Sequence, residues 1–433
     1  MFYDGYEHEE ERDLPLSFCF DVKNIALIVD RLKLLGYPRA KNAHWEAARL
    51  SIFAEAVAAY DTGKWISYSR NKNYYSYLGR YFGTAYSFDR VTGSIDQAAE
   101  FKIPLLMNRK VHCYSSMQST LRATTELVKL FEDVEFEFQH FDVIRLREDP
   151  PVEEGKPKST FKKGKGWTKV KKRSRLIGYA DTDDTVRMRN DLNIINSHLG
   201  GVKLTLPSVF DIEFDDRKRL GRFVRFDDRC VLVSQLRTYR SFCRGSFDLG
   251  GRAYGWWQQL SKELRSQILL DGEEVVEPDF SQLHATMLYA LRGLPVPGDA
   301  YTIPGYERDT IKIAFNVIIN ARTTQAAIGA VQKELKAAAL QHDKAYAAQI
   351  VRAVKAAHPD IKEDFGSDKG VMLMRKDSDI IVKTMLVLVD ERIPFLPVHD
   401  SIVCRRNDKN RVMQVMKDSF LEIFPGFPCK VKF

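Results

Sequence analysis

The chain has 433 residues, of which 44% are hydrophobic and 29% are charged, and its formal net charge is +8. This composition can supply a substantial core for two or three domains. It excludes a membrane-spanning protein, because no run of about 18 apolar residues is present. Residues Glu7 to Asp13 are mostly acidic, unlike a secretory or mitochondrial leader, so we expect a cytoplasmic protein.

The cysteines are scattered along the chain. No two of them stand at the short spacing typical of a zinc ribbon, and their pattern does not indicate a disulfide framework. We therefore expect reduced cysteines in the core, at Cys19, Cys113, Cys230, Cys243, Cys404 and Cys429.

Residues 1–150 are predicted to form a mainly helical N-terminal domain. Apolar residues recur at helical spacing in the stretches 22–35, 44–59 and 115–131, whereas 134–147 has the pattern of a strand. Tyrosine and phenylalanine crowd the segment between Arg70 and Arg90. This segment has two interpretations: a helix-turn-helix or winged module that packs against a template, or the aromatic core of a small helical bundle.

Residues 151–180 are predicted to be a flexible basic arm. Between residues 156 and 175 there are eight Lys, two Arg and no acid, with several glycines and with aromatic groups at Phe161 and Trp167. The segment can be a solvated surface loop, or an arm that follows a nucleic-acid backbone. The residues expected to contact nucleic acid are Lys162, Lys163, Lys165, Lys169, Lys171, Lys172 and Arg173.

Residues 181–246 are predicted to be a helical region rich in arginine. The stretch 184–199 has apolar residues at helical spacing, with Arg187 and Arg189 on the opposite face. Further along the chain, Arg237, Arg240 and Arg244 cluster with few acids beside them. Guanidinium groups match phosphate oxygens in geometry, so these arginines suit phosphate contacts.

A carboxylate at the end of a buried strand is the central feature of residues 247–433. The Asp271-Gly272 pair lies between two short apolar runs and predicts a tight hairpin. The second run ends at Asp279, and apolar residues at helical spacing follow it. An aspartate in this position is commonly a helix N-cap, but it can also be directed into a cleft.

Two later stretches of the sequence favour a carboxylate that is directed into a cleft. The residues Arg308, Lys312, Asn316 and Asn320 are each four apart, so they share one face of a helix whose other face is apolar. Residues 393–404 form two apolar strands around a polar centre, His399-Asp400-Ser401, which predicts a hairpin with an acid at its tip. Two acids on neighbouring strands can hold a pair of magnesium ions, because Mg²⁺ prefers one or two carboxylates plus substrate phosphate oxygens.

These stretches resemble motifs A, B and C of the single-subunit polymerases, which include bacterial DNA polymerase I and the phage-type and mitochondrial RNA polymerases. Asp279-Phe280-Ser281-Gln282 resembles motif A, Arg308 with Lys312 resembles the start of motif B, and His399-Asp400-Ser401 resembles motif C in its phage RNA polymerase form. Asp248 and the stretch Gly250-Gly251-Arg252-Ala253-Tyr254 are similar to the Gly-Arg element that precedes motif A. The resemblance covers residues 247–433.

The resemblance implies an α+β protein with a right-hand polymerase architecture. Residues 247–433 would be the palm and fingers, residues 181–246 a thumb-like region, and residues 1–150 a domain for template contacts. The implied reaction is nucleotidyl transfer, in which a 3′-hydroxyl attacks the α-phosphate of a nucleoside triphosphate. The implied cofactor is a pair of Mg²⁺ ions, with Mn²⁺ as a substitute.

The resemblance also assigns roles to individual residues. The implied metal ligands are Asp279, Asp400 and the backbone carbonyl of Phe280. Lys312 and His399 are the other expected catalytic residues, the lysine as the acid for pyrophosphate and the histidine beside the primer terminus. The expected nucleotide-binding residues are Arg308, Lys312, Asn316, Asn320 and His284, and Arg252 and Tyr254 are expected to touch the primer or template.

Two departures from the family concern the sugar. Asn320 stands where the relatives carry a Tyr, and His284 stands where the DNA polymerases carry a Glu. If His284 and Asn320 face each other and hydrogen-bond, the imidazole would crowd a ribose 2′-hydroxyl, which favours deoxynucleotides. The opposite reading is that the two groups bind that hydroxyl and select ribose.

The sequence-based hypothesis is therefore a small DNA polymerase of phage or mobile-element type. It would act as a monomer, away from membranes, on a DNA template with a primer or nascent strand and nucleoside triphosphates. One alternative is a primer-independent RNA polymerase or primase, which the His399-Asp400-Ser401 triplet favours. The other is a non-catalytic nucleic-acid-binding replication protein on a degenerate palm.

Overall fold

The structure is a computed structural model that combines helices with mostly antiparallel sheets. It divides into two compact units, of which the first comprises Met1–Val186, Lys203–Tyr239 and Trp256–Ile268, and the second comprises Arg187–Val202, Arg240–Gly255 and Leu269–Phe433. The residues described are 14–17, 19–75, 79–111, 118–138, 142–149, 159–162, 166–169, 174–207, 219–220, 222–226, 229–340 and 343–433.

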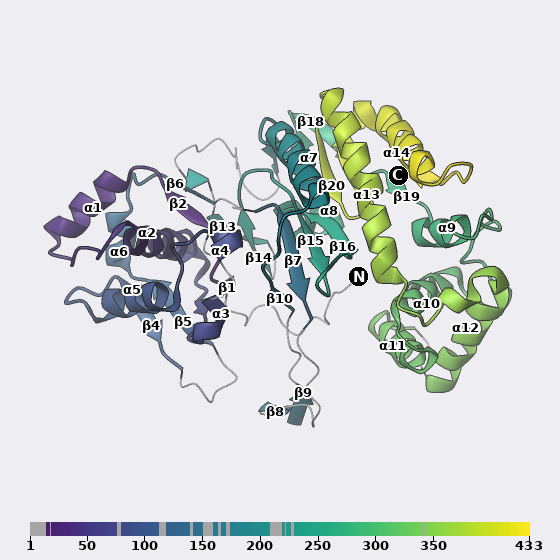
Figure 1. Ribbon diagram of the computed structural model, residues 1–433, viewed down its shortest axis with the longest axis horizontal. Helices are drawn as coiled ribbons and strands as arrows, with labels where there is room; N and C mark the ends of the chain where they lie inside the picture. Colours follow the sequence, from purple (N-terminus) through teal and green to yellow (C-terminus); the bar gives the residue numbers. More distant parts are fainter. Residues whose placement is uncertain are drawn as a thin grey trace. The chain divides into compact units, whose positions relative to one another are not determined.

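The first unit is built from helices packed against small sheets (Figure 1). Its helices are α1 (Ile25–Leu34), α2 (Ala43–Ala58), α3 (Lys72–Tyr75), α4 (Gly79–Phe82), α5 (Phe88–Glu100), α6 (Thr125–Leu130) and α8 (Lys262–Arg265). One sheet has the order β1-β3-β5-β4, formed by β1 (Leu14–Pro15), β3 (Ile66–Tyr68), β5 (Ser119–Ala123) and β4 (Leu106–Arg109). Another has the order β12-β6-β2, formed by β12 (Arg219–Leu220), β6 (Phe136–Phe138) and β2 (Phe20–Val22).

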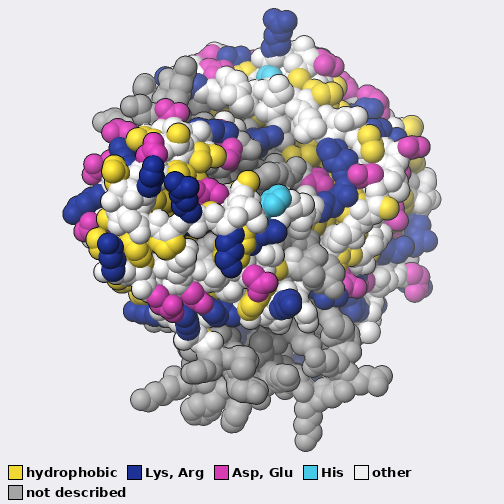
Figure 2. Space-filling view, turned by 60° about the vertical axis from the view of Figure 1, so that its left-hand side comes forward, with side chains coloured by type: hydrophobic (Ala, Val, Ile, Leu, Met, Phe, Trp, Pro, Cys, Tyr) yellow, Lys and Arg dark blue, Asp and Glu magenta, His cyan; other side chains and the backbone are white. Residues whose placement is uncertain are grey.

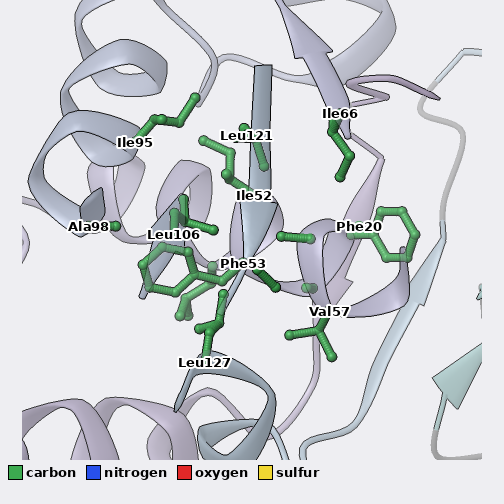
Figure 3. Close-up of a cluster of buried hydrophobic side chains, with 14 of the residues drawn as sticks. Phe20, Ile52, Phe53, Val57, Ile66, Ile95, Ala98, Leu106, Leu121 and Leu127 are labelled. Carbon is green, nitrogen blue, oxygen red and sulfur yellow. The ribbon is translucent and has the colours of Figure 1, made fainter. Parts of the chain in front are cut away.

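Helix α2 lies at the centre of the first unit's hydrophobic core. The helix begins at an N-cap, Asn42, whose side chain accepts a hydrogen bond from Trp45 N at 3.1 Å. Figure 3 shows α2 side chains such as Phe53 meeting residues from α5, α6 and the strands. All of the labelled side chains are buried: Phe20, Ile52, Phe53, Val57, Ile66, Ile95, Ala98, Leu106, Leu121 and Leu127.

The aromatic segment between Arg70 and Arg90 contributes to this packing. Tyr75 and Tyr86 belong to the hydrophobic core, and Tyr81 is buried with its hydroxyl donating to the Ile177 carbonyl at 2.6 Å. The structure thus agrees with the aromatic-core interpretation. The predicted helix over 115–131 is wrong in its first part, because residues 119–123 form β5, whose Leu121 pairs with Ile66 in the core sheet.

The remaining strands of the first unit are short. The hairpin β13 (Arg222–Phe226) with β14 (Arg229–Val233), the pair β7 (Ile144–Glu148) with β10 (Arg175–Leu176), and the pair β8 (Ser159–Lys162) with β9 (Gly166–Lys169) are all antiparallel. β11 (Leu204–Thr205) lies between β10 and β12 in the chain. In the predicted thumb-like region, helix α7 (Asp183–Leu199) is present as expected, but the described residues after it are mainly strands.

The second unit contains the sheet that carries the candidate site. Its strands run in the order β17-β18-β21-β19-β22, and β20 also pairs with β21. The predicted Asp271-Gly272 hairpin is confirmed: both residues have positive φ, 50° and 84°, as the tight turn requires. The strands are β17 (Leu269–Leu270), β18 (Glu273–Val276), β19 (Asp279–Phe280), β20 (Phe395–Val398), β21 (Ser401–Arg405) and β22 (Val431–Lys432).

A long hairpin and a set of helices surround this sheet. The hairpin joins β15 (Tyr239–Cys243) to β16 (Ser246–Tyr254), and β16 packs against helix α13 (Gly370–Asp390). Helix α13 also contacts α9, α10 and α14, so it connects the elements of the unit (Figure 1). The helices are α9 (Leu283–Ala290), α10 (Arg308–Asn320), α11 (Thr324–Ala337), α12 (Lys344–Ala357), α13 and α14 (Lys409–Ile423).

The surface carries charged side chains of both signs. Figure 2 shows a face on which Lys and Arg side chains are interspersed with Asp and Glu. None of the helices in the described part of the chain has the length and apolar character needed to cross a membrane. The described cysteines are free, and three of them, Cys19, Cys404 and Cys429, are buried; Cys113 lies outside the described residues.

Candidate active site

The two predicted metal ligands, Asp279 and Asp400, lie at a strand and at the turn that leads into its neighbouring strand. Asp279 opens β19, and its Cα partner on the antiparallel strand β21 is Ser401, the residue directly after Asp400. Asp400 occupies the two-residue turn between β20 and β21 together with His399, which has a φ of 57°. A left-handed backbone at a non-glycine residue is strained, and such strain is often found where a turn must aim a functional side chain.

The electrostatics of Asp279 show that the two acids are close enough to repel. Burial, followed by the charge of Asp400, raises the pKa of Asp279 to about 7, and Glu277 adds to the rise. Lys432 and Lys312 act in the opposite direction. Lys312 of α10 therefore lies within electrostatic reach of the carboxylate, although the two residues are on different elements.

The donor set fits a hard divalent cation. Two carboxylates and the Phe280 carbonyl provide oxygen ligands only, which is the chemistry that Mg²⁺ prefers, with the remaining positions left to water and phosphate. The Phe280 side chain is buried against Phe420, with ring centroids 6.0 Å apart, so only its backbone is available. Within the described ranges no group of three or more His, Cys, Asp or Glu is placed to hold a metal, so an all-protein cage is absent there.

Helix α10 presents the predicted polar face. Arg308, Lys312 and Asn316 are exposed and Asn320 is half-buried. The opposite face of the helix is fully buried at Ile311, Ala314, Phe315, Ile318 and Ile319. The amphipathic pattern read from the sequence is confirmed, and it leaves the two cations on the accessible side.

Arg308 is held by the loop that precedes α10. Its Nε donates to Asp299 Oδ2 at 2.6 Å, and its guanidinium lies 5.4 Å from the centre of the Tyr301 ring. Gln282, which precedes α9, fixes the same loop by donating to the Gly298 carbonyl at 2.9 Å and accepting from Ala300 N at 2.8 Å. A phosphate bound by Arg308 would therefore have to compete with Asp299.

Arg252 and His284 meet at one buried carboxylate, that of Asp377 on α13. Arg252 Nε donates to both carboxylate oxygens at 3.2 and 3.1 Å, and its Nη2 makes a further short contact. His284 Nε2 lies 3.0 Å from Oδ2. The Asp377 side chain is 0% exposed; burial alone would raise its pKa, but Arg252 and His284 outweigh burial and lower it. Asp377 is thus an ionised acceptor for both residues.

His399 lies half-buried beside Tyr254. The two rings are 6.0 Å apart in an edge-to-face arrangement, and His399 Nδ1 is buried without a hydrogen-bond partner. Burial and the nearby Arg252 lower the pKa of His399 to about 4, so the ring is neutral at neutral pH. This agrees with a packing role rather than proton transfer.

The predicted hydrogen bond between His284 and Asn320 is not formed. The Asn320 Nδ2 group donates instead to the Asn316 carbonyl at 2.7 Å, and its Oδ1 is buried without a partner beside Gly370 of α13. His284 reaches Asp377 on the same helix. Gly370 and Asp377 are two helical turns apart, so Asn320 and His284 contact α13 at points roughly 10 Å from each other along its axis.

Several site residues were missed by the sequence prediction. Asp377 stands in the polar run 375–379, Arg-Lys-Asp-Ser-Asp, where nothing in the local pattern distinguishes it as an acid with a partner far along the chain. Lys432 was given no role in the site, but the pairing of β22 with β19 places it opposite Asp279. Glu277 accepts a hydrogen bond from Ser401 at 2.9 Å. Two residues before Asp279, it could have been recognised as a third nearby acid.

Most of the predicted basic arm lies outside the described residues. The predicted contacts Lys163, Lys165, Lys171, Lys172 and Arg173 lie outside the described residues, and only the backbone is described at Lys162 and Lys169. These assignments stay predictions.

No family model matches the chain, and no curated protein matches it. Among solved structures it is similar to the POL domain of Pol1 from M. smegmatis, in complex with a DNA primer-template and dNTP, with 11% sequence identity and a TM-score of 0.28. The match covers 57% of this chain and 50% of that one, so the chain spans about half of that structure's length. A TM-score of this size does not establish a shared architecture, so the function is argued from the site's own residues.

Proposed function

We propose that the protein is a template-directed nucleic acid polymerase that adds nucleoside triphosphates to a 3′-hydroxyl. The observation that carries the proposal is the pairing of β19 with β21, which sets Asp279 next to the turn that holds Asp400, with Lys312 of α10 within electrostatic reach of Asp279. Two acids with an adjacent phosphate-binding face suit phosphoryl transfer, which depends on positioning and charge neutralisation.

Each part of the site would have a defined task. Asp279, Asp400 and the Phe280 carbonyl would hold Mg²⁺ or Mn²⁺. When bound, the metal would activate the 3′-hydroxyl and offset the charge of the triphosphate. Lys312 and Arg308 would neutralise the β- and γ-phosphates, and Lys312 would donate a proton to the departing pyrophosphate. The neutral ring of His399 would pack beside the primer terminus.

Exchange of ion-pair partners would accompany nucleotide binding. Arg308 is paired with Asp299, whose carboxylate is partly exposed. A triphosphate would displace this single carboxylate, because it offers more charge and more acceptor oxygens. The loop fixed by Gln282 would then lose its ion pair with Arg308 of α10, which links nucleotide binding to the last residue of the stretch that resembles motif A.

Primer extension and de novo synthesis, each with dNTPs and with NTPs in Mg²⁺, test the proposal. Wild type should extend a template-directed product, and Asp279→Ala and Asp400→Ala should each abolish synthesis while template binding stays nearly unchanged. Asp390→Ala, an exposed acid at the far end of α13, is the matched control and should remain active. Template binding without synthesis by the wild type would instead indicate a non-catalytic nucleic-acid-binding protein.

A further inference from the structure

One face of the sheet β1-β3-β5-β4 in the first unit belongs to the hydrophobic core. Ile66 of β3, Leu121 of β5 and Leu106 of β4 are buried on this side (Figure 3). Helix α2 contacts β5 and helix α5 contacts β4. Successive side chains of a strand point to opposite sides of the sheet, so the residues that alternate with these three form its second face.

The second face carries aromatic and basic side chains. Trp65 directly precedes β3, and one further step of the strand register sets it opposite Arg122, which pairs with Met107 of the edge strand β4. Met107 is 40% exposed and Arg109 is also exposed, so this face is accessible at that edge. We call it the open face, and it comprises Trp65, Ser67, Met107, Arg109, Thr120 and Arg122.

Each arginine of the open face lies over an aromatic ring. The guanidinium carbon of Arg109 is 3.8 Å from the centre of the Trp65 ring, and that of Arg122 is 5.8 Å from the centre of the Tyr60 ring. Cation–π attraction holds a guanidinium through its flat side and leaves its N–H groups for other partners. The two arginines are therefore held in place without the use of their donors.

Neither guanidinium is neutralised by a carboxylate. Within the described residues no acid lies at ion-pair distance from Arg109 or Arg122, and Arg122 Nε is buried with no hydrogen-bond partner. Arg70 of the same unit, by contrast, pairs with Asp96 at 2.8 Å. Arg109 and Arg122 thus retain their full capacity to bind an anion.

The hydroxyl groups of the open face are engaged or buried. Ser67 Oγ donates to the Leu14 carbonyl at 3.3 Å, and Thr120 is only 8% exposed. The accessible groups are a stacked ring system, a thioether and two guanidinium groups. These groups suit flat bases and phosphates, and they offer nothing that distinguishes one sugar from another.

We propose that the open face binds a single strand of nucleic acid, with a base stacked on the Arg109–Trp65 pair and a phosphate at Arg122. The two arginines are diagonal neighbours on antiparallel strands, about 7 Å apart at their Cα atoms, so consecutive nucleotides can reach both. A duplex does not present the flat sides of its bases, which restricts this mode to single strands. The open face includes none of the residues proposed for synthesis, so the inference goes beyond the proposed function.

Fluorescence anisotropy with a labelled twelve-nucleotide oligothymidylate and the full chain tests the proposal. Arg109→Ala should weaken binding by about 5- to 50-fold, because a stacking group and a charge are lost. Arg109→Lys keeps the charge but not the flat group, and it should still weaken binding by about 5-fold. Wild-type affinity in both variants would overturn the proposal.

Two controls separate stacking from general charge attraction. Arg39→Ala removes an exposed arginine from the loop between α1 and α2, outside the sheet, and should change the affinity by less than about 2-fold. Arg109→Lys should leave the affinity for a twelve-base-pair duplex unchanged, and an equal loss for strand and duplex would refute stacking. An oligouridylate of the same length should lose affinity by the same factor as the oligothymidylate.

Photocrosslinking locates the bound strand. On irradiation, 5-iodouracil reacts with neighbouring aromatic and sulfur-containing side chains, so a strand that carries it should label Trp65 or Met107. Mass spectrometry of the digested protein identifies the labelled peptides. Crosslinks confined to residues 156–175 would place the strand on the basic arm and overturn the assignment to the open face.

The outcomes also distinguish this inference from the proposed function. A chain that makes no product, but loses strand binding in the Arg109 variants and crosslinks at Trp65, would support the open face and refute the polymerase proposal. A chain that extends primers, with unaltered strand binding in both Arg109 variants, would do the reverse.

Discussion

Asp279→Asn should stabilise the metal-free protein while abolishing synthesis. Burial and the charge of Asp400 raise the pKa of Asp279 from 3.8 to about 7. Between about pH 4 and 7 the unfolded chain loses this proton before the folded chain does, so the stability of the wild type falls as the pH rises. Below pH 4 Asp279 is protonated in both the folded and the unfolded state, and above pH 7 the loss of stability is complete. The asparagine variant has no such loss.

The magnitude follows from the size of the pKa change. A rise from 3.8 to about 7 corresponds to roughly 4 kcal/mol at pH 8, because one pKa unit is about 1.4 kcal/mol. Asp279 is partly exposed, and solvent screening reduces this value, so we expect the variant to be more stable by about 2 kcal/mol. At pH 4 the two proteins should differ by much less.

Urea denaturation in the presence of EDTA, at pH 4.5 and at pH 8, provides the measurement. Asp390→Asn, at an exposed position, controls for removal of a single negative charge. Added Mg²⁺ should narrow the difference at pH 8, because it binds the folded wild type and not the variant. Equal stability of wild type and Asp279→Asn at pH 8 without metal would show that burial and Asp400 do not raise the pKa of Asp279.

Three other predictions concern the second unit. Gly251→Ala should lower the free energy of unfolding by about 2 to 4 kcal/mol in urea denaturation, because φ is 77° and the new Cβ would lie 2.5 Å from the Phe242 ring. Gly305→Ala, where φ is 84° but no atom is close, should lower it by only about 1 kcal/mol. Lys312→Ala should lower kcat at least about 100-fold in primer extension, and wild-type turnover would refute its role as the acid. Lys432→Met removes a charge that lowers the pKa of Asp279, so the acid limb of the pH–rate profile should move to higher pH; an unmoved limb would place Lys432 outside the site.

Local patterns allowed much of the second unit to be predicted. The Asp271-Gly272 turn, the strand before Asp279, the face of α10 and the hairpin around Asp400 each depend on residues within about a dozen positions of one another. Turn residues and hydrophobic periodicity specify such elements directly. The pairing of the two acids followed from their positions at strand ends together with the family resemblance.

Contacts between residues far apart in the sequence could not be predicted from local sequence patterns. Arg252 and Asp377 are 125 residues apart, and neither has a local signal that identifies its partner. An exposed arginine was expected to touch nucleic acid, but its side chain is mostly buried in the ion pair. The predicted contact between His284 and Asn320 is absent for the same reason: the prediction did not include Asp377 of α13, which His284 contacts instead.

The position of strand β22 has a consequence for the order of folding. Cys429 contacts the Ser281 carbonyl from 148 residues away, and Ser401 bonds Glu277 from 124 residues away. Closing loops of this length costs chain entropy before the contacts are made, and folds with such distant pairings form slowly. The helices between them can form earlier from local contacts. The acid pair should therefore assemble in a late step, so refolding monitored at the sheet should lag behind the recovery of helical signal.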